Sequence, residues 1–193
     1  MGYALAEAAI KQGHTVTLIS GPVALTVPHG VGFFSVETAQ QMWDVTRDVV
    51  SQNNTDIAIM TAAVADYRPR FFQPQKVKKT DGELTLELER TPDILASMRP
   101  VFGFTGFLAG FAAETNNLIQ HSMLKLKRKA CDLIIANEVS SANSAFDSNE
   151  NEVTLCFPDG KTNFLPMQSK LELAQVLIGK IVTLANEKWV AEN

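Results

Sequence analysis

The chain has 193 residues and a formal net charge of −4, with 46% hydrophobic and 20% charged residues. This composition is typical of one globular domain, because a single core usually holds about 100–200 residues. The acidic balance argues against a nucleic-acid or membrane-surface partner, for which clustered basic residues are the usual signature. The uncharged run from Pro100 to Ala113 is shorter than the roughly 20 residues of a membrane-spanning helix.

The two cysteines, Cys131 and Cys156, are predicted to be buried and reduced. They are 25 positions apart and neither belongs to a CxxC pair, which excludes the common zinc spacings. Each lies in an apolar run, where a free thiol behaves as a small hydrophobic group. The N-terminal residues lack the basic region and cleavage site of a secretory signal, so we expect a cytoplasmic protein.

Helices and buried strands alternate in the first third of the chain. The predicted elements are a helix at 4–12, strands at His14–Ser20 and Val31–Val36, a helix from the cap Thr38 to about Gln52, and a strand at Ile57–Ala62. The last of these strands is almost continuously hydrophobic, as is typical of a central strand in a parallel sheet.

The middle of the chain interrupts this pattern. Residues 63–82 contain two prolines and many basic side chains, and such a long loop inside a compact domain is often a functional lid. Apolar and polar residues alternate strictly from Glu83 to Arg90, which predicts a half-exposed strand. A short helix is predicted next, with Thr91 as its cap and Pro92 at its first position.

Alternation resumes in the second half. The predicted elements are a strand within Phe102–Ala112, a helix from Thr115 or Asn116 to about Ala130, a strand at Asp132–Ala136, a turn-rich loop at Asn137–Asn151, a hairpin of Val153–Phe157 and Asn163–Leu165, and a last helix to about Ala191. Ser169 and Glu172 form a capping box at the start of that helix. The order predicts one α/β domain over residues 1–193: a doubly wound, mostly parallel sheet with a C-terminal antiparallel hairpin.

Ligands of such sheets bind beyond the carboxyl ends of the strands, so the residues there are candidates. Asp66 follows a run of small residues and could hold a metal ion or a ribose, or simply cap a turn. Lys76 lies in the basic loop, which could close over phosphates or remain solvated.

Three candidates come from the second half of the chain. Lys125 and Lys129 are four positions apart and share a helix face that could bind a triphosphate, although the helix dipole explains them equally well. Asn137 directly follows the strand Asp132–Ala136, where it could reach a substrate pocket or form a turn. The residues by themselves therefore indicate a nucleotide or another anionic small ligand.

The segments taken in order resemble one family along essentially the whole chain. They are VTLISGP (16–22), AAVADYRP (62–69), KVKK (76–79), TPDIL (91–95), GFAAETNN (110–117), KLKRKACDLIIAN (125–137) and PDGK (158–161). Each motif is weak alone, but the ordered set is specific. In it the chain resembles phosphopantothenoylcysteine synthetase, the phosphopantothenate–cysteine ligase of coenzyme A biosynthesis.

The resemblance implies a Rossmann-like fold, a homodimer and a two-step ligation. In the first step CTP and 4′-phosphopantothenate give an acyl-cytidylate and pyrophosphate; in the second, cysteine displaces CMP. Mg²⁺ would offset the triphosphate charge, with Asp66 as its ligand. Lys76 matches the family's flap lysine, which belongs to the second step.

The resemblance also assigns nucleotide contacts residue by residue. By position, the CTP-binding residues would be Met60, Thr61, Ala62, Asp66, Lys76, Pro92, Asp93, Ile94, Leu95, Phe111, Lys125 and Lys129. A helix start at Pro92 would offer free N–H groups to the nucleotide. A flavin-dependent phosphopantothenoylcysteine decarboxylase would be a further partner.

Two features depart from the family pattern. The family begins with a strand and a loop rich in Asn, Ser and Gly, and here Met1-Gly2 corresponds to the end of that loop. We therefore expect the chain to lack the first strand and the loop. The segment Pro100–Gly110 also reads as a partial duplication before GFAAET.

Two other functions are consistent with the predicted fold. An NAD(P)-dependent oxidoreductase would need a Gly-rich first turn and an acidic residue after the second strand, whereas the strand at His14–Ser20 is followed by Gly21-Pro22. A nucleotide-binding dimer without catalytic activity is the third hypothesis.

Overall fold

The computed structural model describes residues 1–52, 55–71, 74–78, 82–138 and 149–192. The helices are α1 (Gly2–Lys11), α2 (Ala39–Gln52), α3 (Ile94–Ser97), α4 (Leu118–Lys129) and α5 (Lys170–Glu192). The strands are β1 (Thr17–Ser20), β2 (Gly32–Ser35), β3 (Ile57–Met60), β4 (Tyr67–Pro69), β5 (Leu88–Arg90), β6 (Phe107–Glu114), β7 (Leu133–Glu138), β8 (Glu150–Cys156) and β9 (Thr162–Ser169).

A five-stranded mixed sheet forms the centre of the molecule, in the order β3-β6-β7-β8-β9. Strands β3, β6 and β7 are parallel, and β8 and β9 form the predicted antiparallel hairpin at the end of the sheet. Strands β1 and β2 pair in parallel in a separate two-stranded sheet, and β4 and β5 pair antiparallel in another. The predicted α/β class with a mostly parallel central sheet is confirmed.

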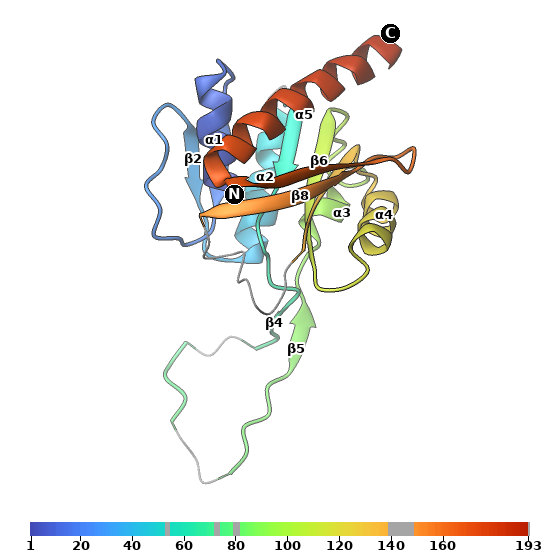
Figure 1. Cartoon of the computed structure of the whole chain (residues 1–193). Helices are drawn as coiled ribbons and strands as arrows, with labels where there is room; N and C mark the ends of the chain where they lie inside the picture. Colours follow the sequence, from blue (N-terminus) through green and yellow to red (C-terminus); the bar gives the residue numbers. More distant parts are fainter. Residues whose placement is uncertain (53–54, 72–73, 79–81, 139–148, 193) are drawn as a thin grey trace.

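Helices cover both faces of the sheet, because both faces of its central strands are apolar. Phe107 and Ala109 of β6 pack into a core formed with α1 and α5, while Leu108 and Ala112 of the same strand face a second core under α2, α3 and α4. Helices α1 and α5 lie against each other on one face (Figure 1). The capping box is present, since the Ser169 hydroxyl donates to the Glu172 carboxylate at 2.7 Å and accepts from the Glu172 N–H.

The segment Pro100–Gly110 contributes a turn and the start of β6. Phe102 and Phe104 are buried in the second core. Gly106 is required by a close approach, because a Cβ there would lie 2.3 Å from the Asp56 carbonyl oxygen. That carbonyl accepts the Phe107 N–H at 2.8 Å, which aligns β6 with β3. Within the described ranges, no helix is sufficiently long and apolar to cross a membrane.

The strand predicted at Glu83–Arg90 is wrong over most of its length. Only Leu88–Arg90 is a strand, because its partner β4 is three residues long and offers no further ladder. Leu84 and Leu86 are exposed instead of covering a core. Strand β4 lies within the segment predicted to be an irregular loop. Strands β4 and β5, with the described residues between them (70–71, 74–78 and 82–87), form an arm that projects from the domain (Figure 1).

Two predicted helix starts are also wrong. Helix α3 begins at Ile94, not at Pro92, and its cap is Asp93, whose carboxylate accepts the Ala96 N–H at 3.0 Å. The Thr91 hydroxyl donates to the Ala65 carbonyl instead, since the chain is still extended there. Helix α4 begins at Leu118, after residue Asn117 in the left-handed conformation. Most of the predicted loop at Asn137–Asn151, residues 139–148, lies outside the described residues.

Candidate functional site

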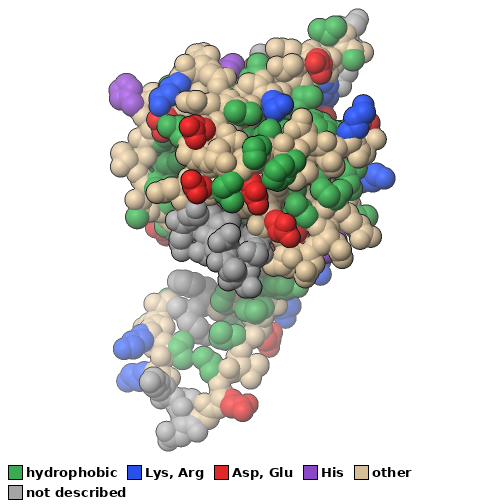
Figure 2. All heavy atoms as spheres, viewed as in Figure 1, with side chains coloured by type: hydrophobic (Ala, Val, Ile, Leu, Met, Phe, Trp, Pro, Cys, Tyr) green, Lys and Arg blue, Asp and Glu red, His purple; other side chains and the backbone are tan. Residues whose placement is uncertain are grey.

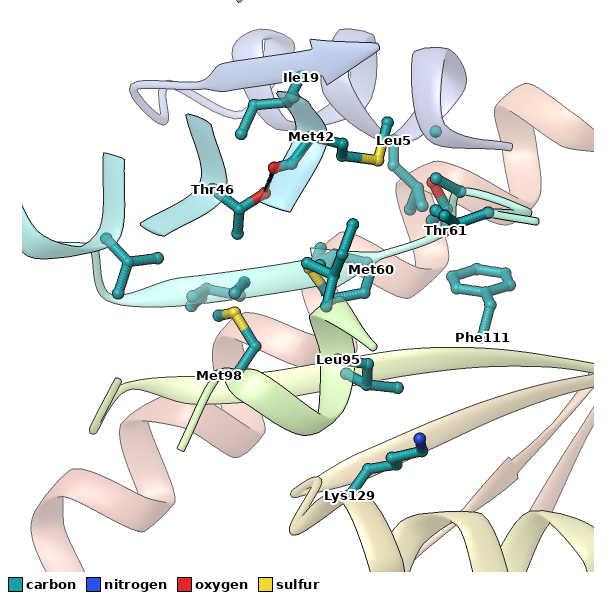
Figure 3. Close-up of a pocket in the computed structure, with 18 of the residues that line it drawn as sticks. Leu5, Ile19, Met42, Thr46, Met60, Thr61, Leu95, Met98, Phe111 and Lys129 are labelled. Atoms are coloured by element: carbon teal, nitrogen blue, oxygen red, sulfur yellow. Dashed lines mark hydrogen bonds between the residues drawn. The ribbon is translucent and has the colours of Figure 1, made fainter. Parts of the chain in front are cut away.

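A cavity of about 1730 Å³ lies between β1 and β3 and continues past their carboxyl ends. Its lining there comes from the segment after β3, the start of α3, the end of β6 and one face of α4. Figure 3 shows side chains from these elements pointing toward the same space, with Met60 and Thr61 on one side and Leu95, Phe111 and Lys129 on another. The structure therefore gathers residues from four separate segments at the edge expected for an α/β sheet.

The cavity contains nearly all of the candidate nucleotide-binding residues. Those in its lining are Met60, Thr61, Ala62, Asp66, Pro92, Asp93, Ile94, Leu95, Phe111, Lys125 and Lys129. Lys76 and Asn137 are not among the lining residues. Contact with a nucleotide remains a prediction for each of them.

Lys129 occupies the floor of the site and is paired with Asp93. The Lys129 side chain is 7% exposed, and its ammonium group donates to the Asp93 carboxylate. Burial disfavours the charged form of Asp93. The hydrogen bonds from Lys129 and from the Ala96 N–H outweigh this effect and hold the pKa of Asp93 below its usual value. One carboxylate thus joins the cap of α3 to the last turn of α4.

Lys125 lies one helical turn earlier on the same face of α4. Its ammonium group donates to the carbonyl of Phe111, within β6, at 2.6 Å. Burial lowers the pKa of Lys125, although the nearby Glu114 carboxylate opposes the shift. The Lys125 ammonium group therefore lies at the cavity against a backbone carbonyl, and a phosphate oxygen could replace that carbonyl as its partner.

Glu114, at the end of β6, and His121, on α4, form a pair beside Lys125. Glu114 Oε2 lies 3.2 Å from His121 Nδ1, and both residues line the cavity. Arg90, Thr91 and Arg128 also line the cavity, although none of them was predicted from the sequence as a site residue. Arg128 is adjacent to Lys129 in a basic run of the sequence, and that run is the feature from which Arg128 could have been predicted as a site residue.

Asp66 is exposed and lies between β3 and β4. Its backbone carbonyl accepts the Thr91 N–H at 3.0 Å, which fixes the segment against the residues preceding α3. Within the part of the chain that the structure describes, no three His, Cys, Asp or Glu side chains are grouped to hold a metal ion. A lone carboxylate nevertheless fits Mg²⁺ that arrives with a triphosphate, because Mg²⁺ is usually held by one or two carboxylates plus substrate phosphates.

Lys76 lies on the projecting arm and is exposed, outside the cavity lining. Its placement is compatible with a flap only if the arm approaches the cavity when a ligand is bound. Asn137 was expected to follow its strand directly. It lies inside β7 instead, opposite Ala113 of β6, because β7 continues to Glu138.

The chain is similar to proteins of coenzyme A biosynthesis. A model of the DNA/pantothenate metabolism flavoprotein C-terminal domain matches residues 1–184. The coenzyme A biosynthesis bifunctional protein CoaBC of Vibrio vulnificus strain YJ016 is 44% identical over 186 residues, which cover 95% of this chain and 46% of that protein. The Bacillus subtilis strain 168 protein of the same name is 42% identical over 188 residues, which cover 97% of this chain and 46% of that protein.

A solved structure gives the same relationship. The crystal structure of the C-terminal domain of CoaBC superposes with a TM-score of 0.79 at 35% identity, covering 96% of this chain and 82% of that one. The chain spans about half the length of the curated relatives it matches. Because the family model covers nearly the whole chain and the fold agrees, the chain belongs to the DNA/pantothenate metabolism flavoprotein C-terminal domain family.

Proposed function

We propose that the chain is a phosphopantothenate–cysteine ligase of coenzyme A biosynthesis that uses CTP and Mg²⁺. The observation that carries the proposal is the convergence of Asp66, the start of α3, Phe111 and two lysines of α4 on one cavity. These residues come from segments up to 63 positions apart, and the resemblance to the ligase family assigns nucleotide contacts to them. Their charges suit a ligand that brings phosphates and a divalent cation together.

In the first step, a carboxylate oxygen of 4′-phosphopantothenate attacks the α-phosphorus of CTP, and pyrophosphate leaves. Lys125 and Lys129 would hold phosphate oxygens and stabilise the charge that develops on them. Asp66 would hold Mg²⁺, which offsets triphosphate charge when it is bound. Phe111 and Leu95 provide apolar surface beside the phosphates, against which a base could pack.

In the second step, the cysteine amine attacks the acyl carbon, CMP leaves with the bonding electron pair, and the amine loses a proton. Lys76 would close on the intermediate from the arm and place a positive charge beside the departing phosphate. Asn137 is proposed to contribute to the pantothenate side of the pocket, reached from the end of β7.

The test is CTP-dependent release of pyrophosphate from 4′-phosphopantothenate and cysteine, with omission of each substrate as controls. Turnover that needs all three substrates supports the ligase. A protein that binds CTP but releases no pyrophosphate is the non-catalytic nucleotide-binding dimer. Thermal shifts compared among CTP, ATP, NADH and NADPH separate the ligase from an NAD(P)-dependent oxidoreductase, because only the latter is stabilised most by the dinucleotides.

We also propose that the chain is a homodimer that acts in the cytoplasm with a flavin-dependent phosphopantothenoylcysteine decarboxylase as partner. The dimer is supported by the apolar surface of the projecting arm, where Phe71, Val77 and Leu86 are exposed. Figure 2 shows hydrophobic side chains on the surface of this arm. A second copy packed on the arm would remove this apolar surface from water. The decarboxylase would consume the ligase product, which accords with the relatives being named bifunctional proteins.

A further inference from the structure

Glu114 and His121 meet at the carboxyl edge of the sheet from two neighbouring elements. Glu114 is the last residue of β6 and lies on the strand face that carries Leu108 and Ala112, because side chains alternate along a strand. Helix α4 packs on this strand, and His121 lies in its first turn. The 3.2 Å contact between Glu114 Oε2 and His121 Nδ1 therefore joins the end of the strand to the start of the helix that follows it.

The pair is accessible to a ligand in the cavity. The side chains of His121 and Glu114 are 45% and 29% exposed, and both residues line the cavity. Along α4, His121, Lys125 and Lys129 recur every four residues, so one face of the helix presents all three to the same space. The imidazole thus lies one helical turn from Lys125, a proposed phosphate ligand.

The charge around the pair differs from that of the phosphate site. Burial lowers the pKa of Lys125 and the Glu114 carboxylate opposes this shift, so the two charges lie within reach of each other. Glu138, at the end of β7, is the register partner of Glu114, which places two carboxylates at the ends of neighbouring strands. CTP and 4′-phosphopantothenate are anionic. Of the three proposed substrates, cysteine alone brings a cationic group, because its amine is largely protonated at neutral pH.

The second step of the proposed ligation needs a proton acceptor, because an ammonium nitrogen has no lone pair with which to attack. Four described acidic or histidine side chains line the carboxyl end of the cavity: Asp66, Asp93, Glu114 and His121. Asp66 is the proposed Mg²⁺ ligand. Asp93 is a poor acceptor, because its hydrogen bonds, first that from Lys129, hold its pKa below the usual value despite burial. The Glu114–His121 pair is left for the proton.

We propose that His121, oriented by Glu114, accepts a proton from the cysteine amine in the second step. This role rests on the proposed ligase function. His121 Nδ1–H donates to the Glu114 carboxylate, which leaves the imidazole lone pair on Nε2. Nε2 takes one proton from the ammonium group, and the freed nitrogen lone pair forms a bond to the acyl carbon.

The remaining bonds and protons of this step balance without another reactant. The bond between the acyl carbon and the phosphate oxygen breaks, and CMP leaves with its electron pair. The second proton on the nitrogen passes to the departing phosphate, which yields the amide. The imidazolium, stabilised by the Glu114 carboxylate, returns its proton to water, to which the ring is exposed.

The spacing on α4 suits this chemistry. His121 and Lys125 are separated by about 6 Å along the helix axis. In the acyl-cytidylate one oxygen joins the acyl carbon to the α-phosphorus, and a nitrogen poised for attack lies about 3 Å from that carbon. The attacking nitrogen is therefore roughly 5–6 Å from the phosphorus. One helical turn thus allows Lys125 to bind the phosphate while His121 reaches the amine.

The experiment measures the two steps separately in the intact chain. Pyrophosphate release from CTP, Mg²⁺ and 4′-phosphopantothenate, without an amine, reports the first step in a single turnover. Cysteine or hydroxylamine is then added, and mass spectrometry of quenched samples quantifies the amide or the hydroxamate. Hydroxylamine is largely unprotonated at neutral pH, so its nitrogen can attack without first giving up a proton. Its capture of the acyl group therefore reports an intact site that lacks only the proton acceptor.

His121→Asn should leave pyrophosphate release unchanged and slow amide formation with cysteine by about a hundredfold, the lower end of the range for general base catalysis. Capture by hydroxylamine should stay within about threefold of the original rate. Glu114→Gln should slow the cysteine reaction by about tenfold, because an amide at this place also stabilises the imidazole tautomer that has no lone pair on Nε2. His29→Asn, on a loop outside the cavity lining, is the matched control and should change none of the rates.

The other outcomes separate the role of His121 from the proposed function. Equal slowing of the cysteine and hydroxylamine reactions in His121→Asn would overturn the proposal, because the residue would then only position the site. An unchanged cysteine rate would overturn it as well. Absence of pyrophosphate release by the unchanged protein would contradict the ligase function and the role of His121 with it. If His121→Asn does not fold, His121→Gln and Glu114→Gln decide between the same outcomes.

Discussion

Asp93 links two elements of the site through one side chain. One carboxylate oxygen caps α3 and the other accepts from the buried Lys129. The Lys129 ammonium has little contact with water, whereas Asp93 is about half exposed. A triphosphate that reached this floor could share the ammonium group without leaving Asp93 unsolvated. The Lys129 ammonium group is therefore suited to bind a ligand phosphate while Asp93 remains solvated.

Lys129→Met tests this reading at the residue scale. The change keeps most of the buried stem and removes the charge, while Asp93 stays about half exposed to water. We therefore expect unfolding free energy to fall by about 1–3 kcal/mol, the range for a lost hydrogen bond to a charged group. CTP affinity should fall by about tenfold or more, since charge-assisted bonds to phosphate are among the stronger ones. Calorimetric titration with CTP measures the second effect. Lys127→Met, on the exposed side of α4, is the control. An equal loss in both variants would remove Lys129 from the site.

Asp66→Asn tests the proposed magnesium ligand. The side chain is exposed, so we expect the thermal midpoint to remain within about 2 °C of the original. Binding of CTP with Mg²⁺ should weaken by about 1–3 kcal/mol, the range for contacts to charged groups. The comparison is made with and without Mg²⁺, with Asp159→Asn in the β8–β9 turn as control. An unchanged titration would show that Asp66 does not contact the nucleotide or its metal.

At the scale of elements, the arm differs from the rest of the domain because it exposes several large apolar side chains close together. Cross-strand ion pairs such as Arg68–Glu89, at 2.8 Å, join its base but are solvent-exposed and contribute little. Its leucines, Leu84, Leu86 and Leu88, are exposed and cover no core among the residues that the structure describes. An arm of this kind is stabilised when its apolar face is covered by another molecule, which for the proposed dimer is the second copy.

Leu86→Glu should therefore convert the proposed dimer to monomer. Leu86 is 63% exposed in the single chain, so the change should cost little in the folding of the domain. Burying a carboxylate at the interface would be unfavourable by several kcal/mol. Sedimentation velocity at micromolar concentration measures the shift. Val190→Glu, 81% exposed near the end of α5, should leave the dimer intact. Monomer before any substitution would contradict the dimer itself.

Lys76→Gln tests the arm as a flap. In pre-steady-state reactions with all substrates, we expect acyl-cytidylate to form at the original rate and its conversion to amide to slow on the order of a hundredfold. Mass spectrometry of quenched reactions detects the accumulated intermediate. Lys78→Gln, two positions further along the same exposed segment, is the matched control. Equal slowing of both steps would show that Lys76 only binds CTP.

At the scale of the whole molecule, the buried thiols should make stability fall in alkali. Burial raises the pKa of Cys131 from 9.0 to about 12. The stabilising effect of a protonated thiol is complete below pH 9 and is lost as pH rises from 9 towards 12, because only the unfolded chain then releases the proton. Between pH 8 and pH 10, Cys131→Ala should lose about 1.4 kcal/mol less unfolding free energy than the unchanged protein. Urea unfolding at the two pH values measures this, and equal losses would place Cys131 in contact with water.

Much of the fold follows from local pattern. The apolar strand at Ile57–Ala62, the capping box at Ser169 and the hairpin around Pro158–Lys161 all depend on residues close together in sequence. The limits of the strand at Glu83–Arg90 could not be predicted from the alternation of apolar and polar residues. Such alternation gives a strand only where a neighbouring strand pairs with the segment and its apolar face is covered. For the same reason β7 includes Asn137, since β6 continues alongside it.

The sequence by itself determined the order of elements, the α/β class and the family, because hydrophobic period, capping residues and ordered motifs are local properties of the chain. Only the tertiary structure decided that Asp93 rather than Thr91 caps α3, that Lys129 is buried against it, and that Lys76 lies apart on an arm. It also decided that β1 and β2 pair with each other in a sheet separate from the central five strands. These outcomes depend on which distant groups compete for each hydrogen bond and each buried surface, and that competition is settled only when the layers pack.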